Sequence, residues 1–395
     1  TKRACPDGAG AGPGLVTSLE NVSYRLDSGL RHVEPYDFDF TTHVKQRWVG
    51  KTLLEVFAKE FIAYSVEYYK ASIEAGRVTV NGQCVTPGHV LRDGERIVHR
   101  AVRCQENPVL DRGRIRVVCE TPELLVVSKP SSLPIHPCGS YRFNSLIAIL
   151  RAQGTVPPDA ELHTTHRLDR LTSGLVIFAK TKAAARQISA WFQGNEIRKT
   201  YLARVRGSFR GLVERAAALA TGGGCVMGDE AGEALPVGVS LAQSGRIRLS
   251  GYIQCVDRKV GKYVFCAERP SSGEEAKDAS TDFEFAGEAP NGESVVRCFP
   301  ATGRTHQIRV HLLHLGFPIA NDSCYGGELR HDPSLPLIPH VHQSGVAEGD
   351  GGEGGEAPEG GQTTMHPSGI FLHALTYRLP DDEYSCETPM WAECG

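Results

Sequence analysis

The chain contains 395 residues, of which 41% are hydrophobic, and its formal net charge is −3. This length allows two or three domains with a sizeable core, and no apolar run approaches the ~20 residues that a membrane-spanning helix needs. The 12 cysteines are scattered without a C-x-x-C pair. This spacing argues against a thiolate zinc site and a dense disulfide framework, and it predicts a reduced, intracellular protein, with the compartment left open.

The negative charge is concentrated in two segments. Residues 271–293 contain seven acids and one lysine, and residues 341–362 contain five acids and no lysine or arginine. Without these segments the chain would carry a net charge of +8. A basic body of this kind is compatible with binding to the phosphates of a nucleic acid. Both segments are predicted to be flexible acidic inserts, the second because it is a Gly/Glu-rich low-complexity stretch.

The N-terminal part predicts an extension followed by a small domain. Residues 1–47 are expected to be an N-terminal extension, partly disordered because its first 20 residues are rich in Gly and Ala. From residue 48 onward the pattern is helical, and Leu53, Leu54, Phe57 and Phe61 have the spacing of one helix face. A second helical stretch follows, and Val-Thr-Val-Asn-Gly at 78–82 indicates a strand and a turn. Residues 48–103 are therefore expected to form a small domain of helices and strands.

A charged loop beside a buried strand marks the centre of the chain. Residues 163–175 read HTTHRLDRLTSGL and set the carboxylate of Asp169 between Arg167 and Arg170. The apolar run that follows indicates a buried strand, and a rigid scaffold of this kind often presents a catalytic group. Upstream, the segment 129–137 begins with Lys129 and contains three prolines, which predict a rigid, extended loop.

Two further segments carry polar side chains next to predicted core positions. Residues 198–205 alternate as a strand that contains Tyr201. Residues 302–312 read TGRTHQIRVHL and predict a helix with Thr305 as its N-cap and Gly316 as its end. Between these segments, residues 207–293 show few periodic patterns and are expected to be loops inserted between short strands.

Together these motifs resemble one known family. The strings HRLDRLTSG and TGRTHQIRVHL, the strand K-x-Y-x-A-x-V at 199–205 and the loop at 129–137 are similar to signatures of the RluA family of RNA pseudouridine synthases. Residues 34–40 and 47–51 resemble the eukaryotic branch of that family. Ser132 stands where glycine is common in that loop. The segment 48–103 resembles the S4-type RNA-binding module. The resemblance to the synthases covers nearly all of the chain from about residue 114 onward.

The resemblance implies both a fold and a reaction. The fold is α+β: a catalytic domain over 110–395 with a mixed, mainly antiparallel sheet and flanking helices, preceded by the small α/β S4-like domain. The reaction is the isomerisation of specific uridines to pseudouridine in RNA, without a metal or cofactor. The expected partner is tRNA, with rRNA or mRNA as alternatives, and the chain is expected to be a monomer.

The motif positions imply individual roles. Asp169 matches the catalytic aspartate, Arg309 the arginine that pairs with it, and Tyr201 an active-site tyrosine that either stacks on the uracil or helps to remove its C5 proton. Arg167 matches the residue that fills the space left by the flipped uridine. Five residues are expected to bind the substrate: Lys129, Arg167, Arg304, His306 and Ile308.

Other interpretations remain open from the sequence. A catalytically inert RNA-binding protein would keep the same fold. A hydrolase could use Asp169 on a nucleoside, although the motifs offer no second carboxylate of the kind that glycosidases use. Without the family resemblance, Tyr201 would be a half-buried strand residue, Ile308 a core residue, and the Asp169–Arg309 pair a plain salt bridge.

Overall fold

The computed structural model describes residues 22–61, 64–103, 106–138, 141–220, 235–257, 261–271, 276–328, 337–341, 363–367 and 369–393. The chain divides into two compact units: Thr1–Pro108, Pro137–Asn144 and Pro339–Met365 form the first, and Val109–His136, Ser145–Ile338 and His366–Gly395 form the second. The first 21 residues of the expected extension lie outside the described residues, and so does the expected acidic insert from residue 342 to its end. No helix in the described ranges is long and apolar enough to cross a membrane.

The first unit contains a four-stranded sheet and two helices that share one core. The sheet has the order β3-β6-β4-β5. Its elements, with the hairpin that precedes them, are β1 (Tyr24–Asp27), β2 (Leu30–Val33), β3 (Tyr36–His43), η1 (Gln46–Trp48), α1 (Leu53–Glu60), α2 (Val66–Glu74), β4 (Val78–Val80), β5 (Gln83–Cys84) and β6 (Arg96–Arg103). Trp48, Phe57 and Ile73 lie in the common core.

The start of this small domain differs from the expected boundary at residue 48. Strand β3 pairs with β6 along its whole length, from Tyr36 opposite Arg103 to His43 opposite Arg96. The sheet therefore begins at Tyr36, inside the segment that was expected to be an extension. Helix α1 begins as its sequence requires, because Thr52 and Glu55 form a capping box in which each side chain accepts the other's backbone N–H.

A buried glutamate ties a distant segment to the first unit. Glu106 is 7% exposed and accepts hydrogen bonds from the backbone N–H groups of Arg142, Phe143 and Asn144 at 2.8, 3.1 and 3.0 Å. It also accepts one from the Tyr36 hydroxyl at 2.6 Å. Because charge-assisted bonds of this kind are strong, they explain why residues 137–144 belong to the first unit although they follow strands of the second.

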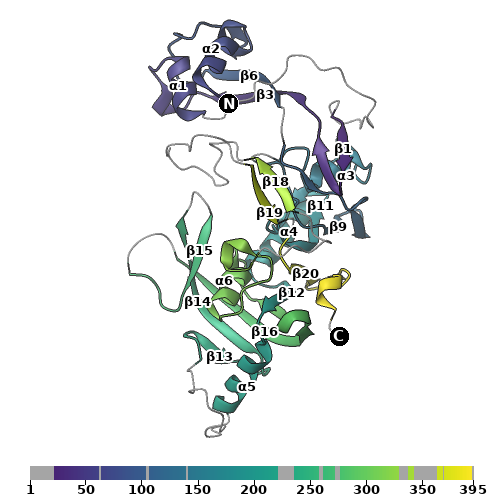
Figure 1. Cartoon of the computed structure of the whole chain (residues 1–395). Helices are drawn as coiled ribbons and strands as arrows, with labels where there is room; N and C mark the ends of the chain where they lie inside the picture. Colours follow the sequence, from purple (N-terminus) through teal and green to yellow (C-terminus); the bar gives the residue numbers. More distant parts are fainter. Residues whose placement is uncertain are drawn as a thin grey trace. The chain divides into compact units, whose positions relative to one another are not determined.

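The second unit is built on a twelve-stranded sheet (Figure 1). Its main order is β13-β14-β16-β17-β12-β20-β11-β9-β8, with β15 beside β14, β21 beside β20 and β10 beside β11. The β11–β20 pair is parallel and the other described pairs are antiparallel, which confirms the expected mixed, mainly antiparallel sheet. The strands are β8 (Arg116–Glu120), β9 (Leu124–Lys129), β10 (His163–Thr164), β11 (Ser173–Ala179), β12 (Arg198–Arg206), β13 (Val239–Leu241), β14 (Ile247–Asp257), β15 (Lys262–Cys266), β16 (Lys277–Ala289), β17 (Glu293–Pro300), β20 (Leu372–Arg378) and β21 (Glu383–Ser385). Short strands elsewhere are β7 (Val109–Leu110), β18 (Leu337–Val341) and β19 (Thr363–Pro367).

Helices flank this sheet. They are α3 (Leu146–Ala152), α4 (Lys182–Gln193), α5 (Phe209–Ala220) and α6 (Gln307–His314), with the short turns η2 (Pro290–Gly292), η3 (Ser323–Tyr325) and η4 (Met390–Ala392). Helices α5 and α6 share one hydrophobic core with β12, β14, β16 and β17, in which Phe209, Phe283 and Leu312 are fully buried. Because α6 is anchored in this core, the residues at its start are held against the sheet.

The segment 271–293 is not the flexible acidic insert that its composition predicted. Residues 277–289 form β16, which pairs with β14 and β17 inside the sheet. Ala279, Thr281 and Phe283 are buried at every second position, while Asp282 and Glu284 on the other face pair with arginines of neighbouring strands. The sequence already showed this alternation of apolar and polar residues, and Asp282 and Glu284 lie on the more exposed face of the strand.

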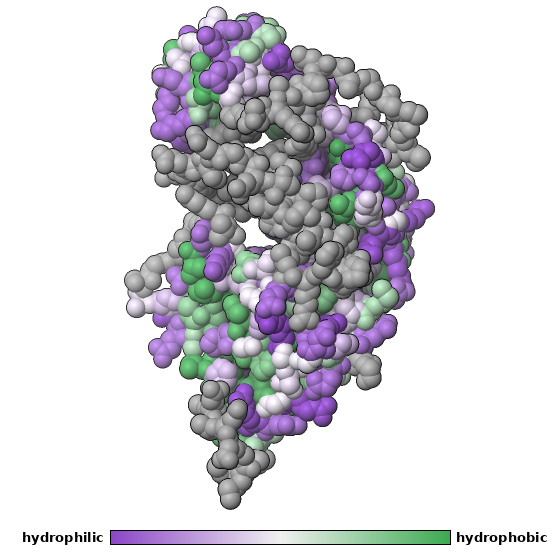
Figure 2. Space-filling model, in the orientation of Figure 1, coloured by the Kyte–Doolittle hydropathy of each residue, from purple (hydrophilic) through white to green (hydrophobic). Residues whose placement is uncertain are grey.

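The hairpin of β14 and β15 has a partly open hydrophobic face. In the space-filling view, hydrophobic side chains gather over these two strands (Figure 2), and Val256 is 51% exposed. The same hairpin carries Tyr263, whose backbone N–H donates to the hydroxyl of Tyr325.

Candidate active site

The sheet topology brings two of the motifs together at one residue of β20. Ala374 pairs with Tyr201 of β12 on one side and with Gly174 of β11 on the other. Because neighbouring strands lie about 4.8 Å apart, the loop before β11, which carries Asp169, lies close to Tyr201. Gly174 has a φ of +113°, and a Cβ there would lie 2.2 Å from the carbonyl oxygen of Ala374. Only glycine allows this close approach of the two strands.

Arg309 links this loop to the start of α6. Its guanidinium is bound by Asp322 through two hydrogen bonds, from Nε to Oδ2 at 2.6 Å and from Nη2 to Oδ1 at 2.9 Å. The remaining Nη1 donates to Oδ2 of Asp169 at 3.2 Å. A bidentate pair fixes the plane of a guanidinium, so Asp322 determines where Nη1 points. Asp322 lies within the part of the chain that resembles the family, but its position in the sequence predicted no role for it.

Asp169 is held as a carboxylate with one oxygen occupied. Burial acts to raise its pKa, but His306 in its protonated form, the charge and hydrogen bond of Arg309 and the charge of Lys129 outweigh burial and hold the pKa below its usual value. Asp169 is therefore ionised at neutral pH. Within the described residues only Oδ2 has a hydrogen-bond donor, and 30% of the side chain is exposed. Oδ1 is the oxygen left for a substrate.

His306 reaches the same carboxylate oxygen. It is the N-cap of α6 in place of the expected Thr305, and its φ of 56° lies in the left-handed region. Its Nε2 lies 3.7 Å from Oδ2 of Asp169, and its Nδ1 lies 2.8 Å from the hydroxyl of Tyr325. That hydroxyl already accepts the backbone N–H of Tyr263 at 3.0 Å, so its own proton is available to Nδ1.

These bonds favour the tautomer of His306 that carries its proton on Nε2. Burial is the largest effect and lowers the pKa of His306 despite the opposing charge of Asp169, which leaves the ring neutral at neutral pH. Burial also raises the pKa of Tyr325, so its hydroxyl keeps a proton to donate. With Nδ1 as acceptor, the ring proton is on Nε2 and faces Asp169. Tyr325 is thus a second residue of the site that the sequence analysis did not assign.

Tyr201 is paired with a buried tyrosine. Its hydroxyl lies 2.8 Å from the hydroxyl of Tyr377 on β20. Burial raises the pKa of Tyr201 to about 12, with a smaller opposing effect of the Tyr377 hydrogen bond and a further rise from the charge of Asp169. Tyr201 is therefore an uncharged phenol at neutral pH.

Lys129 does not occupy the substrate-binding position that was expected. It is 1% exposed, and its Nζ donates to the carbonyl oxygens of Pro130, Leu133 and Arg170 at 3.0, 2.8 and 3.2 Å. Burial lowers its pKa to about 7, against the raising effect of Asp169. Because all three donors are used on backbone, Lys129 joins its own loop to the Asp169 loop and does not face a substrate.

Ser132 stands in that loop at the position where glycine is common in the family. Its φ of 69° lies in the left-handed region where glycine is favoured. The side chain is fully buried, and its Oγ accepts the backbone N–H of Leu110 at 2.8 Å. A serine is tolerated at this position because its hydroxyl satisfies a buried backbone donor.

The remaining expected residues fall into two groups. Arg167 and Arg304 are exposed, and Arg304 donates from Nε to the carbonyl oxygen of Asp278 at 2.8 Å. Ile308 is 6% exposed and belongs to the core shared with α5. Arg167 and Arg304 are thus accessible to RNA, whereas Ile308 packs in the core and does not form the expected wall of the site.

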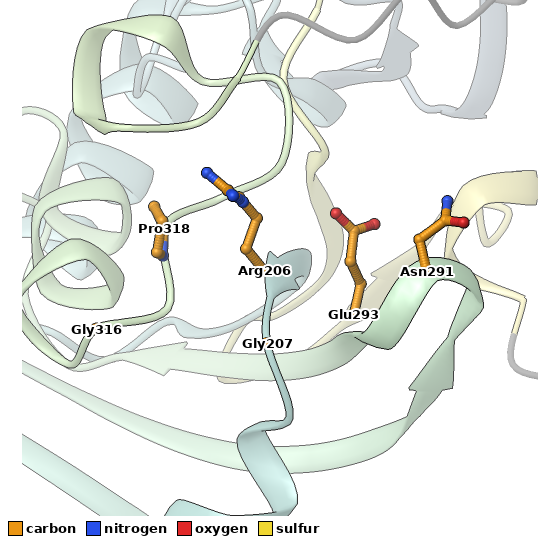
Figure 3. Close-up of a pocket in the computed structure, with 6 residues that line it drawn as sticks. All are labelled: Arg206, Gly207, Asn291, Glu293, Gly316 and Pro318. Atoms are coloured by element: carbon orange, nitrogen blue, oxygen red, sulfur yellow. The ribbon is translucent and has the colours of Figure 1, made fainter.

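A separate hollow lies at the far end of β12. Its volume is about 420 Å³, and it is lined by Arg206, Gly207, Asn291, Glu293, Gly316 and Pro318 (Figure 3). Arg206 is five positions beyond Tyr201 on the same strand, which corresponds to roughly 16 Å at 3.3 Å per residue. The hollow is therefore distinct from the Asp169 cluster.

Comparisons with known proteins agree with this geometry. The profile of the RNA pseudouridylate synthase family matches residues 123–314, and that of the S4 domain matches residues 53–97. Human pseudouridylate synthase RPUSD2 is 38% identical over 305 residues, which are 77% of this chain and 48% of the human protein. RNA pseudouridine synthase 7 of Oryza sativa subsp. japonica is 32% identical over 408 residues, which are 94% of this chain and 93% of the rice protein.

A third relative is the mitochondrial tRNA pseudouridine(32) synthase of Saccharomyces cerevisiae, 33% identical over 304 residues, which are 77% of this chain and 56% of the yeast protein. The chain thus spans about half the length of the human and yeast relatives and nearly all of the rice relative. On the evidence of these matches, the chain belongs to the RluA-type RNA pseudouridine synthases, isomerases that act on uridine in RNA, and it carries an S4 domain before its catalytic unit.

Proposed function

We propose that this chain converts specific uridines of tRNA to pseudouridine, with Asp169 as the residue that acts on the sugar. The observation that supports this role is an ionised carboxylate with Oδ2 held by Arg309 and Oδ1 without a described donor. The name of the yeast relative favours tRNA over rRNA or mRNA.

The chemistry requires a negative group next to C1′. Cleavage of the C1′–N1 bond leaves positive character on C1′ and negative charge on the uracil. A fixed carboxylate stabilises the positive carbon in the transition state, as in glycoside hydrolysis. The uracil then presents C5 to C1′, a carbon–carbon bond forms, and the C5 proton leaves while N1 takes up a proton. Substrate and product are isomers, so no co-reactant is consumed.

Tyr201 is proposed to contact the uracil as an uncharged ring. With a pKa of about 12, the phenol is protonated at neutral pH and is a poor acceptor for the C5 proton. Stacking on the base is the role that this protonation state favours. His306 would present its Nε2–H beside the reacting carbon, where it can hydrogen-bond to a uracil oxygen that gains negative charge.

RNA binding is proposed to involve exposed cations of the catalytic unit together with the S4 domain. The target uridine must leave its stack, which costs a few kcal/mol, and Arg167 is the exposed residue proposed to fill the vacated space. Arg304 is the second exposed cation near the site. The chain is proposed to act as a monomer.

The test is to incubate the chain with transcribed tRNA and with an rRNA fragment, and to map pseudouridine at each uridine. The expected result is pseudouridine at a defined tRNA position and none in the rRNA fragment. Release of free uracil would indicate a hydrolase instead. Binding of tRNA without pseudouridine in either RNA would indicate an inert RNA-binding protein, and modification of the rRNA alone would refute the choice of tRNA.

A further inference from the structure

Lys199 is a buried cation without an anionic partner in the described structure. It lies on β12, two positions before Tyr201, and is 8% exposed. Its Nζ donates to the carbonyl oxygen of Thr302 at 3.1 Å. Among the described residues, it makes no other hydrogen bond and no salt bridge. The charged or titratable groups that interact with it there are both basic: Arg304 and His166.

This arrangement is unfavourable unless something negative binds there. Lysine is almost never fully buried without a partner, because removing an ammonium from water costs several kcal/mol. Lys129 in the same unit is a buried lysine whose hydrogen-bonding capacity is fully used, since its three N–H donors bind three carbonyl oxygens. Lys199 uses one donor on a carbonyl oxygen and has two left.

The turn next to Lys199 is rigid and open. Gln307 holds it: its Oε1 accepts from the Thr302 hydroxyl at 2.7 Å and from the backbone N–H of Arg304 at 3.0 Å. Gly303 has no side chain, and a Cβ there would meet nothing closer than Nζ of Lys199 at 3.8 Å. A ligand can therefore approach Nζ past Gly303, and Arg304 follows directly in the chain.

We propose that Lys199, with Arg304, binds a phosphate of the substrate RNA next to the target uridine. This inference rests on the proposed function, because it places a phosphodiester beside the uridine that Asp169 acts on. A phosphate oxygen accepts from the two remaining donors of Lys199 and offsets the charges of both basic residues. The fixed distance between this phosphate and Tyr201 on β12 would set which nucleotide enters the site.

The pKa of Lys199 gives the proposal a measurable pH dependence. Burial, with a smaller contribution from the charge of Arg304, lowers this pKa to about 8. A bound phosphate favours the charged form and would raise the pKa, so binding takes up protons near pH 8. Affinity for RNA should therefore fall as the pH rises above about 8. The RNA affinity of the Lys199→Arg variant should not change with pH over the same range, because arginine stays charged.

The test measures binding and stability of Lys199→Met in an Asp169→Asn background, so that turnover does not interfere. With transcribed tRNA as the probe, the affinity should drop about 10-fold or more, and the slope of log affinity against log salt should decrease by about 1. Without RNA, the melting temperature should stay the same or rise, because an unpaired buried charge has been replaced by an apolar chain of similar length. Lys199→Arg should restore most of the affinity.

The matched control is Lys180→Met, which removes the same charge from a lysine paired with Glu120 at the surface. It should change affinity no more than about 2-fold. An affinity and salt slope of Lys199→Met equal to those of the control would overturn the proposal while leaving the proposed function intact. A lower melting temperature with unchanged affinity would show that Lys199 is structural. Failure of the Asp169→Asn parent and the wild type to bind tRNA would overturn both proposals together.

Discussion

Asp322→Asn is the substitution that best tests how the arginine is held. Asp322 is 1% exposed and neutralises Arg309, which is 5% exposed. Removing one partner of a buried ion pair costs about 3–5 kcal/mol when the other charge is left uncompensated, but Arg309 keeps Asp169 as a second anionic partner. The amide keeps one acceptor, so we take the lower end, about 3 kcal/mol, which corresponds to a fall in melting temperature of roughly 6–12 °C for a unit of this size. Pseudouridine formation should also be lost, because Nη1 of Arg309 would no longer be directed at Asp169.

A surface pair with the same geometry provides the control. Arg248 donates to Asp282 through Nε at 2.6 Å and Nη2 at 2.8 Å, but 47% of the arginine side chain is exposed. Asp282→Asn should therefore cost only about 0–1 kcal/mol. Thermal denaturation of both variants and pseudouridine yield on one tRNA preparation make the comparison. Equal losses of melting temperature in the two variants would refute the argument from burial, and full activity of Asp322→Asn would refute the positioning role.

Three other outcomes are expected. Gly174→Ala should unfold or strongly destabilise the catalytic unit, because its Cβ would collide with the backbone of Ala374. Gly113→Ala, whose Cβ would meet nothing within 4 Å, should lower the free energy of unfolding by only about 1 kcal/mol. Circular dichroism melts of the two variants measure this difference. Since the pKa of Asp169 is depressed, activity and the stability from its ion pair should persist above its ordinary value of ~3.9 and be lost as the pH falls through the folded pKa; a rate that already falls near pH 6 would contradict this. Deletion of residues 1–103 should weaken tRNA binding and leave a cooperative melt of the catalytic unit; unchanged affinity would show that the S4 domain is not used.

The sequence indicated the candidate catalytic pair better than the residues that hold it. Asp169 and Arg309 come from strong motifs, and the structure brings them within one hydrogen bond. Asp322 was not assigned because an aspartate outside a catalytic signature gives no sign of its partner. Tyr325 was missed for the same reason, since its contact with His306 depends on a left-handed N-cap that replaces the expected one.

Burial is the property that the sequence indicated least well. Lys129 and Ile308 were expected to bind substrate, yet both are buried, because a motif position does not show which way a side chain points. The composition of residues 271–293 suggested a flexible insert, although Ala279, Thr281 and Phe283 of β16 are buried at alternate positions. Net charge outweighed periodicity in that prediction, and the period of two was the better guide.

The most direct test of the central claim is Asp169→Asn, with melting temperature, tRNA affinity and pseudouridine yield measured on the same preparation. The amide keeps the shape of the side chain and an acceptor for Arg309, but it cannot stabilise positive charge on C1′. We expect a folded protein that binds tRNA close to the wild-type affinity and makes no detectable pseudouridine. A protein that is folded, binds tRNA and makes pseudouridine at near the wild-type rate would contradict the catalytic role of Asp169.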